Sequence, residues 1–580
     1  MSRNSPHRGF TLVEMLVAVT LVLLMMSMFA QIFQIAGGAI TKQRGIAEND
    51  QKTRTFQTVL KADLDKRTFR LVMPWAAGED GAQAEASAPD RTGYLYISEN
   101  DPLSDLDDLL QFTTNVTIVT KNRSTDPYYG KATLLPGTTL YTQPNQPEAD
   151  DSRPDANGAG QSTAAEVSYF VRGKNLYRRV LLIREPLKLT NAADQPRFGT
   201  NRDAFDWNDT AGSPDTYPQY NGIGGNSTFW NDFDYSAYQF PAGSTGHARF
   251  HGLKDLDNAS TVTQFPLANP RYRFGFHPFT AHSREWASNQ MFLGRYTHEE
   301  TSRETFNYPQ SLSAIGDPMS SAVTVNMDPD FYYVTTFANG PRRGEDLILA
   351  NVHSFDIKVW DDAVVVNGDR GGFVDLGHSS GSGYYRFGAN QHRTAGIDFG
   401  PDLSASADSD RDGDDFDNRV FDTWHPAVSA DFNKDGTVGG GESNVAPPYR
   451  AILYNPVTSG ATYQDYETWV AAPDTTSPSR YSVGSKVFPQ AGYPALASQR
   501  LYYVCVASDA TVSGAVGIVN HGVSNPTWPR TAGSRVLDGD LVWEAVDNWK
   551  PLRALQITVR FLDVTSGQMR QSTLVHSLID

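Results

Sequence analysis

One apolar segment near the start of the chain constrains the fold more than any other feature. Residues 10–36 read FTLVEMLVAVTLVLLMMSMFAQIFQIA, and 21 of these 27 residues are apolar. A helix needs about 20 such residues to cross a bilayer. The best secretory-type cleavage site, after Ala30, has Met28 where a small residue is required. We therefore expect a polar leader over 1–9, followed by a single membrane-spanning helix over 10–36.

The junction between leader and apolar segment reads Gly9-Phe10-Thr11-Leu12-Val13-Glu14. These residues resemble the type III signal of the prepilin family, which comprises type IV pilins and type II secretion pseudopilins. The resemblance implies that a prepilin peptidase cuts after Gly9 and methylates Phe10. It also implies that Glu14 neutralises the N-terminal amine of a neighbouring subunit. A carboxylate in an apolar helix costs about 2.5–3.5 kcal/mol, so Glu14 needs such a partner unless it lies at the interface of a plain single-span anchor.

An amphipathic stem helix is expected over 37–73. The stretch contains no proline, Pro74 follows as a stop, and Gly37-Gly38 marks a bend where the span leaves the lipid. Its apolar residues recur at helical spacing, namely Phe56, Leu60, Leu64 and Leu71. The stem has eight Lys and Arg against four Asp and Glu. We expect the apolar stripe to dock on the protein's own sheet and the basic face to meet neighbouring subunits.

The rest of the chain predicts an α+β fold, in which the long N-terminal α-helix packs on an enlarged antiparallel β head formed by 74–447 and 548–580. Alternating apolar residues predict the strands 94–97, 116–120, 166–171, 331–337, 347–366, 552–563 and 572–579, and a hairpin over 167–183. The strands near 176–183, 348–362 and 552–579 resemble those of PilW-like minor pilins, the J-type pseudopilin and the Verru_Chthon cassette family. Residues 191–310 are expected to form long surface loops whose aromatic side chains serve mainly packing, the alternative being a glycan-binding or subunit-contact surface.

The sharpest motif outside the N-terminus predicts a Ca²⁺ site. The pattern D-x-[DN]-x-[DN]-G-x₅-E is met by Asp431, Asn433, Asp435, Thr437 and Glu442. Prolines on both sides leave no room for the paired helices of an EF-hand, so a free-standing loop is expected. A weaker run comprises Asp408, Asp410, Asp412 and Asp414, and lacks the closing glutamate because Arg419 stands there. The alternative for this Asp/Gly-rich segment, 408–442, is a solvated acidic turn.

Residues 463–547 predict a small β module inserted into the head. The sequence resembles a module of phage-tail and bacterial surface proteins. Tyr502, Trp528 and Trp543 are candidates for stacking on sugar rings, or else form the core of a very small domain. Cys505, the one cysteine, is expected to be buried, and its solitude excludes a disulfide scaffold or a multi-cysteine metal site.

Charge and motifs exclude several function classes. With 49 basic and 66 acidic residues the net charge is −17, which argues against nucleic acid as a partner. Ser379 lies in a G-x-S-x-G match, but the sequence GSGYYRFG that follows cannot begin the helix of a nucleophile elbow. We therefore expect no enzyme.

The resemblance implies a minor pilin or pseudopilin, a structural subunit at or near the tip of a pilus-like or secretion filament. It implies an inner-membrane single-pass protein before assembly, with its head outside the cytoplasm. Its expected partners are other pilin-like subunits through the N-terminal helix, the prepilin peptidase, and a glycan or secreted cargo. The alternatives are a membrane-anchored glycan-binding surface protein outside any filament and, more remotely, a membrane-tethered hydrolase using Ser379.

Overall fold

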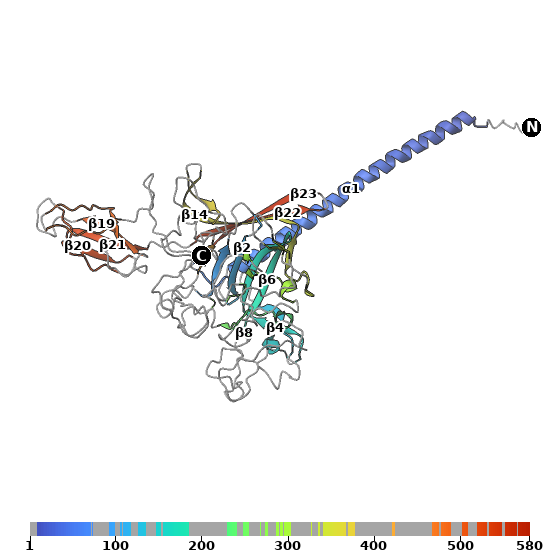
Figure 1. Cartoon of the computed structure of the whole chain (residues 1–580). Coiled ribbons are helices and arrows are strands. Elements are labelled where there is room, and N and C mark those ends of the chain that lie inside the picture. Colours follow the sequence, from blue (N-terminus) through green and yellow to red (C-terminus); the bar gives the residue numbers. More distant parts are fainter. Residues whose placement is uncertain are drawn as a thin grey trace, which may run out of the picture.

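A computed structural model shows a long helix joined to a β-rich head (Figure 1). The structure describes residues 9–70, 72, 92–98, 105–106, 108–117, 126–134, 147–151, 153, 155–184, 229–239, 248–253, 267, 273–275, 286–288, 291–293, 295–302, 326–327, 334–336, 340–366, 369–376, 420–423, 467–474, 477–488, 501–508, 519–529, 533–547, 552–564 and 567–579. All structural statements below concern these residues.

The helix α1 (Leu12–Asp65) contains both the apolar segment and the stem, and its 54 residues form one uninterrupted rod (Figure 1). At the usual rise the rod is about 81 Å long. The chain remains helical at Gly37-Gly38, where a bend was expected, since a glycine costs a helix only about 1 kcal/mol. The predicted stem boundary at residue 73 is wrong. The helix ends at Asp65 because Arg67 and the neighbouring backbone pair with the sheet at Thr114.

A six-stranded antiparallel sheet forms one part of the head, in the order β13-β6-β5-β2-β1-β16. Its strands are β1 (Leu95–Ser98), β2 (Leu109–Asn115), β5 (Ala164–Arg172), β6 (Asn175–Ile183), β13 (Leu347–Ala350) and β16 (Val420–Asp422). The predicted hairpin is present as β5–β6, and its turn residues Gly173 and Lys174 both have positive φ, as a tight hairpin turn requires. Of the strand predicted at 116–120, Val116 and Thr117 form a turn directly after β2, and 118–120 lie outside the described residues. The side chain of Asn115 accepts hydrogen bonds from Thr117 and turns the chain there.

A four-stranded antiparallel sheet, in the order β15-β14-β22-β23, forms a second part of the head. It comprises β14 (Val352–Val366), β15 (Asp369–Val374), β22 (Ala554–Asp563) and β23 (Gln568–Ser577). The single strand predicted over 347–366 is divided at Asn351, whose φ of 58° bends the chain. As a result β13 joins the first sheet and β14 joins the second, so this one stretch links the two.

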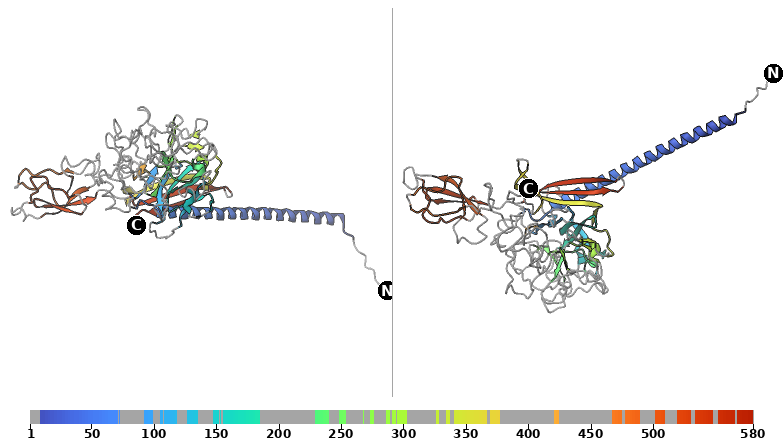
Figure 2. Two further views of the ribbon diagram at one scale, coloured as in Figure 1. Left: turned by 90° about the horizontal axis from the view of Figure 1, so that it is seen from below. Right: turned by 45° about the horizontal axis from the view of Figure 1, so that its top comes forward.

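The core lies where α1 meets both sheets. Phe56, Leu60 and Leu64 of the predicted apolar stripe are all buried, together with strand residues from each sheet. Full burial of such a side chain contributes about 1.5–3 kcal/mol. Figure 2 shows from two further sides that β22 and β23 run beside the head end of α1. The antiparallel α+β architecture expected from the sequence is therefore confirmed.

Shorter elements surround the first sheet. They are β3 (Tyr128–Lys131), η1 (Pro147–Asp151), β4 (Ala159–Ser162), α3 (Phe229–Asp232), β7 (Ala237–Gln239), β8 (Ala248–Phe250), β9 (Trp286–Ser288), β10 (Met291–Leu293), α4 (His298–Thr301), β11 (Asn326–Met327) and β12 (Val334–Thr336). Within 191–310 the aromatic rings for which the structure gives burial lie in the interior, namely Phe229, Trp230, Phe233, Tyr235, Phe250, Phe274 and Tyr296. These rings serve packing.

A further five-stranded sheet, in the order β17-β18-β19-β21-β20, lies apart from the head in Figure 1. Its strands are β17 (Glu467–Thr468), β18 (Lys486–Phe488), β19 (Leu501–Ser508), β20 (Arg535–Asp538) and β21 (Leu541–Asp547). They fall between β16 and β22 of the head in the chain, within the range expected for the inserted module. Cys505 is buried in this sheet.

Candidate processing and assembly site

The residues predicted for processing precede α1 directly. Gly9 and Phe10 are exposed and non-helical, and a Cβ added at Gly9 would meet no atom within 4 Å. Phe10 is 82% exposed. The peptide bond between Gly9 and Phe10 is thus unobstructed by the described part of the chain.

Thr11 and Glu14 begin the helix with a capping box. The Thr11 hydroxyl accepts a hydrogen bond from the Glu14 N–H (3.3 Å), and the Glu14 carboxylate accepts from the Thr11 N–H (2.9 Å) and hydroxyl (3.0 Å). The carboxylate is therefore folded back toward residue 10. Cleavage after Gly9 would create an amine at Phe10, and a positive charge is unfavourable at the N-terminus of a helix. A carboxylate held at this position offsets that charge, whether the amine belongs to the same chain or to a neighbour.

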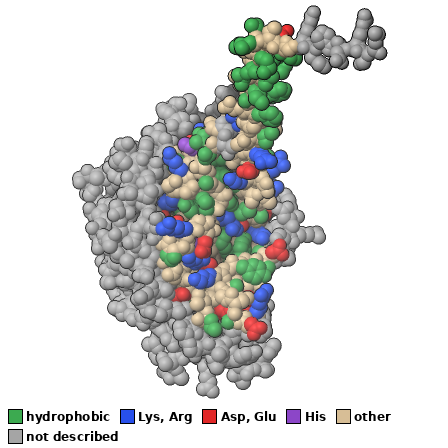
Figure 3. Space-filling view, turned by 90° about the vertical axis from the view of Figure 1, so that its right-hand side faces the viewer, with side chains coloured by type: hydrophobic (Ala, Val, Ile, Leu, Met, Phe, Trp, Pro, Cys, Tyr) green, Lys and Arg blue, Asp and Glu red, His purple; other side chains and the backbone are tan. Residues whose placement is uncertain are grey.

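The first part of α1 has no protein around it, since every residue from Gly9 to Arg44 is exposed. Among the described residues, α1 is the one helix long and apolar enough to cross a membrane. Figure 3 shows apolar side chains around the projecting end and charged ones where the helix enters the head. A surface this apolar requires lipid or neighbouring helices to cover it, which is consistent with membrane anchoring.

A buried ion pair fastens the stem to the head. Asp63 of α1 accepts two hydrogen bonds from the Arg178 guanidinium of β6, from Nε at 2.6 Å and Nη2 at 2.9 Å, and a third from the Tyr169 hydroxyl of β5 at 2.6 Å. The Asp63 side chain is only 5% exposed. Burial, together with the Asp63 charge, raises the pKa of Tyr169, so that the phenol remains a donor. We call Asp63, Arg178 and Tyr169 the stem lock.

Two further contacts align the stem with the C-terminal strand of the head. Gln57 donates to the Ser572 hydroxyl of β23 (2.7 Å), and Arg67 donates to the carbonyl of Leu578 (2.7 Å). In the sequence, Asp63 and Arg67 are two of the stem's charged residues, Arg67 also falling at the helical spacing of the apolar stripe, and neither of these contacts was predicted. A signal was available for Asp63, because this acid lies between Leu60 and Leu64 on the apolar stripe and so faces the core.

Two of the three candidate sugar-stacking residues, Trp528 and Trp543, lie in the interior of the module. Trp543 is fully buried and Trp528 is 5% exposed, and both belong to the module's core cluster. The indole N–H groups of Trp469 and Trp543 both donate to Asp538 (2.8 and 2.9 Å). These two candidate rings thus have no open face for a sugar, which favours the core alternative because stacking needs an accessible ring. Tyr502 lies in β19, where its backbone pairs with Val546.

Other predicted sites lie outside the described residues. These are the Ca²⁺ loop with Asp431, Asn433, Asp435, Thr437 and Glu442, the weaker run with Asp408, Asp410, Asp412 and Asp414, and Ser379. Among the residues that the structure describes, no group of three or more His, Cys, Asp or Glu side chains could hold a metal ion.

Comparison with known families identifies the N-terminal segment. The family described as the prokaryotic N-terminal methylation motif matches residues 4–30, which include Gly9, Phe10 and Glu14. No curated protein matches this chain. No solved structure matches it either. The N-terminal segment is therefore of the prepilin type, as the sequence predicted.

Proposed function

We propose that this protein is a minor pilin or pseudopilin, a structural subunit at or near the tip of a type IV pilus-like or type II secretion-like filament. The prepilin peptidase removes residues 1–9 and methylates Phe10. Before assembly the mature chain is held in the inner membrane by the first half of α1, with the head outside the cytoplasm. Its partners are other pilin-like subunits, and its role is structural and not catalytic.

The observation that carries this proposal is the methylation motif at the start of a helix that is bare over its apolar half and fastened to a head over its other half. Such a helix can exchange lipid for the helices of neighbouring subunits while the head remains folded. The size of the head supports a place at the tip, since the head extends to one side of α1 and the module projects beyond the head end of the helix (Figures 1 and 2). A subunit that repeats along a shaft has to leave space for its neighbours, whereas a terminal subunit does not.

N-terminal mass spectrometry of the protein from cells that contain the peptidase tests the processing step. We expect a first residue of N-methylated Phe10, and an unprocessed chain for the variant Gly9→Val. An intact Met1, or cleavage at another bond, would refute the assignment to the prepilin class. Glu14→Gln is the matched variant for assembly, because it keeps the shape of the side chain and removes the charge. It should be cleaved normally and yet fail to enter filaments.

Immunogold labelling of the module tests the tip position. We expect label at one end of a filament and a few copies per filament. Uniform label along the shaft would contradict a minor, terminal role. Protein that remains in the membrane in cells with abundant filaments would favour the anchored surface protein instead.

A further inference from the structure

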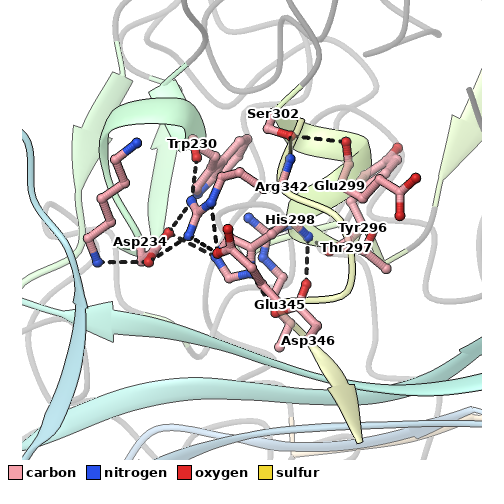
Figure 4. A network of polar contacts seen from close by, with 12 residues as sticks. Trp230, Asp234, Tyr296, Thr297, His298, Glu299, Ser302, Arg342, Glu345 and Asp346 are labelled. Atoms are coloured by element: carbon pink, nitrogen blue, oxygen red, sulfur yellow. Dashed lines mark hydrogen bonds and ion pairs between the residues drawn. The ribbon is translucent and has the colours of Figure 1, made fainter. Parts of the chain in front are cut away.

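A second cluster of charged side chains lies within the head, beside β6 (Figure 4). Its centre is His298, the first residue of α4, whose side chain is 7% exposed. One ring nitrogen, Nδ1, is hydrogen-bonded to the carboxylate of Asp346, and the other, Nε2, lies 2.8 Å from the carboxylate of Asp234. These residues are 48 and 64 positions from His298 in the chain. The imidazole therefore joins three separate segments.

The protonation state of His298 follows from this geometry. Both ring nitrogens face carboxylate oxygens, which only accept, so both nitrogens have to carry a proton. Burial by itself would lower the pKa of His298, but the charges of Asp346 and Asp234 outweigh it and the pKa is raised. The pKa of each carboxyl is correspondingly lowered, against the effect of its burial, by the imidazolium.

The remaining charges around the ring come from each neighbouring element. Arg342 donates to both oxygens of Asp234, one of them at 3.0 Å, and pairs with Glu345. From β6 below, the buried Arg179 opposes a proton on His298, and its own pKa is lowered to about 10 by burial. On α4 itself, Glu300 is engaged in the capping box with Thr297. Two carboxylates thus face the imidazolium directly, whereas Arg342 is shared between Asp234 and Glu345.

The cluster connects the outer layer of the head to the sheet. We use "outer layer" for residues 229–236, 295–302 and 340–346. The backbone of this layer reaches β6 at two points, because Leu182 donates to the Asp234 carbonyl and Arg178 to the Asp346 carbonyl, each at 2.8 Å. Contact within the layer is very close at Gly340, where a Cβ would approach the Glu299 carbonyl oxygen to 1.9 Å. Because these segments are packed so closely, the outer layer has little room to rearrange when one of the charged contacts around His298 is lost.

We propose that His298 is an alkaline-sensitive latch, which as an imidazolium holds the outer layer closed and on losing its ring proton releases 229–236 from α4. The proton passes to solvent, and neutral imidazole retains one N–H. That N–H stays with Asp346, because the Asp346 carboxylate has, among the described residues, just one further hydrogen bond, from the backbone N–H of His298. The contact with Asp234 is the one lost, because Asp234 keeps Arg342 and the backbone N–H of Lys131 (2.7 Å). A lone pair on Nε2 then faces the Asp234 carboxylate, and the two repel each other.

The sign of the pH dependence follows from linkage. A histidine whose pKa is raised in the folded state adds stability that is fully present below its unfolded pKa of about 6.5 and is lost as pH rises through the folded pKa. Between these two values the opening equilibrium of the outer layer should rise about ten-fold per pH unit. The β22–β23 hairpin, which belongs to the second sheet, should not follow this dependence.

Hydrogen exchange on the full chain in detergent micelles, corrected for intrinsic exchange rates and measured from pH 6 to pH 10, tests the latch. The amides of Ser236 and Ser302, which donate within the structure, report on the outer layer, and that of Val559 in β22 reports on the core. Selective ¹³C labelling of histidine gives the titration midpoint of His298. We expect outer-layer protection to fall ten-fold or more as pH rises from about 6.5 to that midpoint and to level off above it, with Val559 unchanged.

Three variants complete the test. His298→Gln should give weak outer-layer protection that does not vary with pH, and the exposed His353→Gln should behave like the parent. Asp234→Asn removes one facing charge and is the second route if His298→Gln does not fold; it should move the titration midpoint down. The proposal is overturned if His298 is neutral at pH 7, if protection stays constant while His298 titrates, or if Val559 loses protection in parallel.

Discussion

The stem lock gives the sharpest prediction, because one substitution, Asp63→Asn, removes a charge and leaves the shape of the side chain unchanged. Asparagine can still accept from the Tyr169 hydroxyl, but the Arg178 guanidinium then has no anion within the lock. The Asp63 side chain is 5% exposed and that of Arg178 is 22% exposed. Breaking a buried pair by removing one partner typically costs about 3–5 kcal/mol. Since Arg178 retains some contact with water, we expect the low end, a loss of about 3 kcal/mol in the free energy of unfolding.

Urea unfolding of the full chain in detergent, followed by tryptophan fluorescence, measures this loss. The matched control is Asp65→Asn, two residues away, where the carboxylate lies 3.8 Å from His576 and is 20% exposed. That change should cost less than about 1 kcal/mol, as is usual for partly exposed pairs. The double variant Asp63→Asn/Arg178→Gln should be more stable than the sum of the single changes predicts, by about 2 kcal/mol.

Either of two results would refute the reasoning on the stem lock. A loss below about 1 kcal/mol for Asp63→Asn would mean that the pair is solvated and contributes like a surface ion pair. Strict additivity in the double variant would mean that Asp63 and Arg178 do not act on each other. Under the proposed function Asp63→Asn should also be cleaved after Gly9 at the normal rate, since the lock lies far along α1 from that bond.

Three further predictions concern other parts of the molecule. Burial raises the pKa of Asp356 to about 6, so its ionisation opposes folding as pH rises from about 4 to 6. Asp356→Asn should therefore raise the free energy of unfolding at pH 7 by about 1 kcal/mol after allowance for solvent screening, and leave it unchanged at pH 4, as urea unfolding at the two pH values would show. Trp543→Ala should cost about 3–5 kcal/mol in the module, and unchanged thermal unfolding would contradict a core role. Removing Ca²⁺ by chelation should lower Tm, and Asp431→Ala should abolish that difference; equal melting curves would leave 431–442 as an acidic turn.

Some features of this protein could be predicted from short stretches of sequence. Gly9, Phe10 and Glu14 lie within six residues at the start of the apolar segment, so the motif can be recognised without knowing the fold. The β5–β6 hairpin is likewise local, because its turn and its first cross-strand pairs lie within a few residues. Helical spacing also located Phe56, Leu60 and Leu64 correctly on the buried face. In each case the interacting residues are neighbours along the chain.

Only the tertiary structure decided the features that depend on distant pairing. Asp63 meets Arg178 across 115 positions, and His298 meets two carboxylates 48 and 64 positions away. The periodicity of the sequence does not reveal these contacts, since a charged residue that will be buried is the same amino acid as one that will be solvated. The end of α1 was mispredicted for the same reason. Pro74 is a local stop signal, but the backbone of Arg67 already pairs with Thr114 of the first sheet and so ends the helix earlier. The two tryptophans of the module likewise could serve a core or a surface until their burial was known, because burial is set by the whole fold and not by the residue.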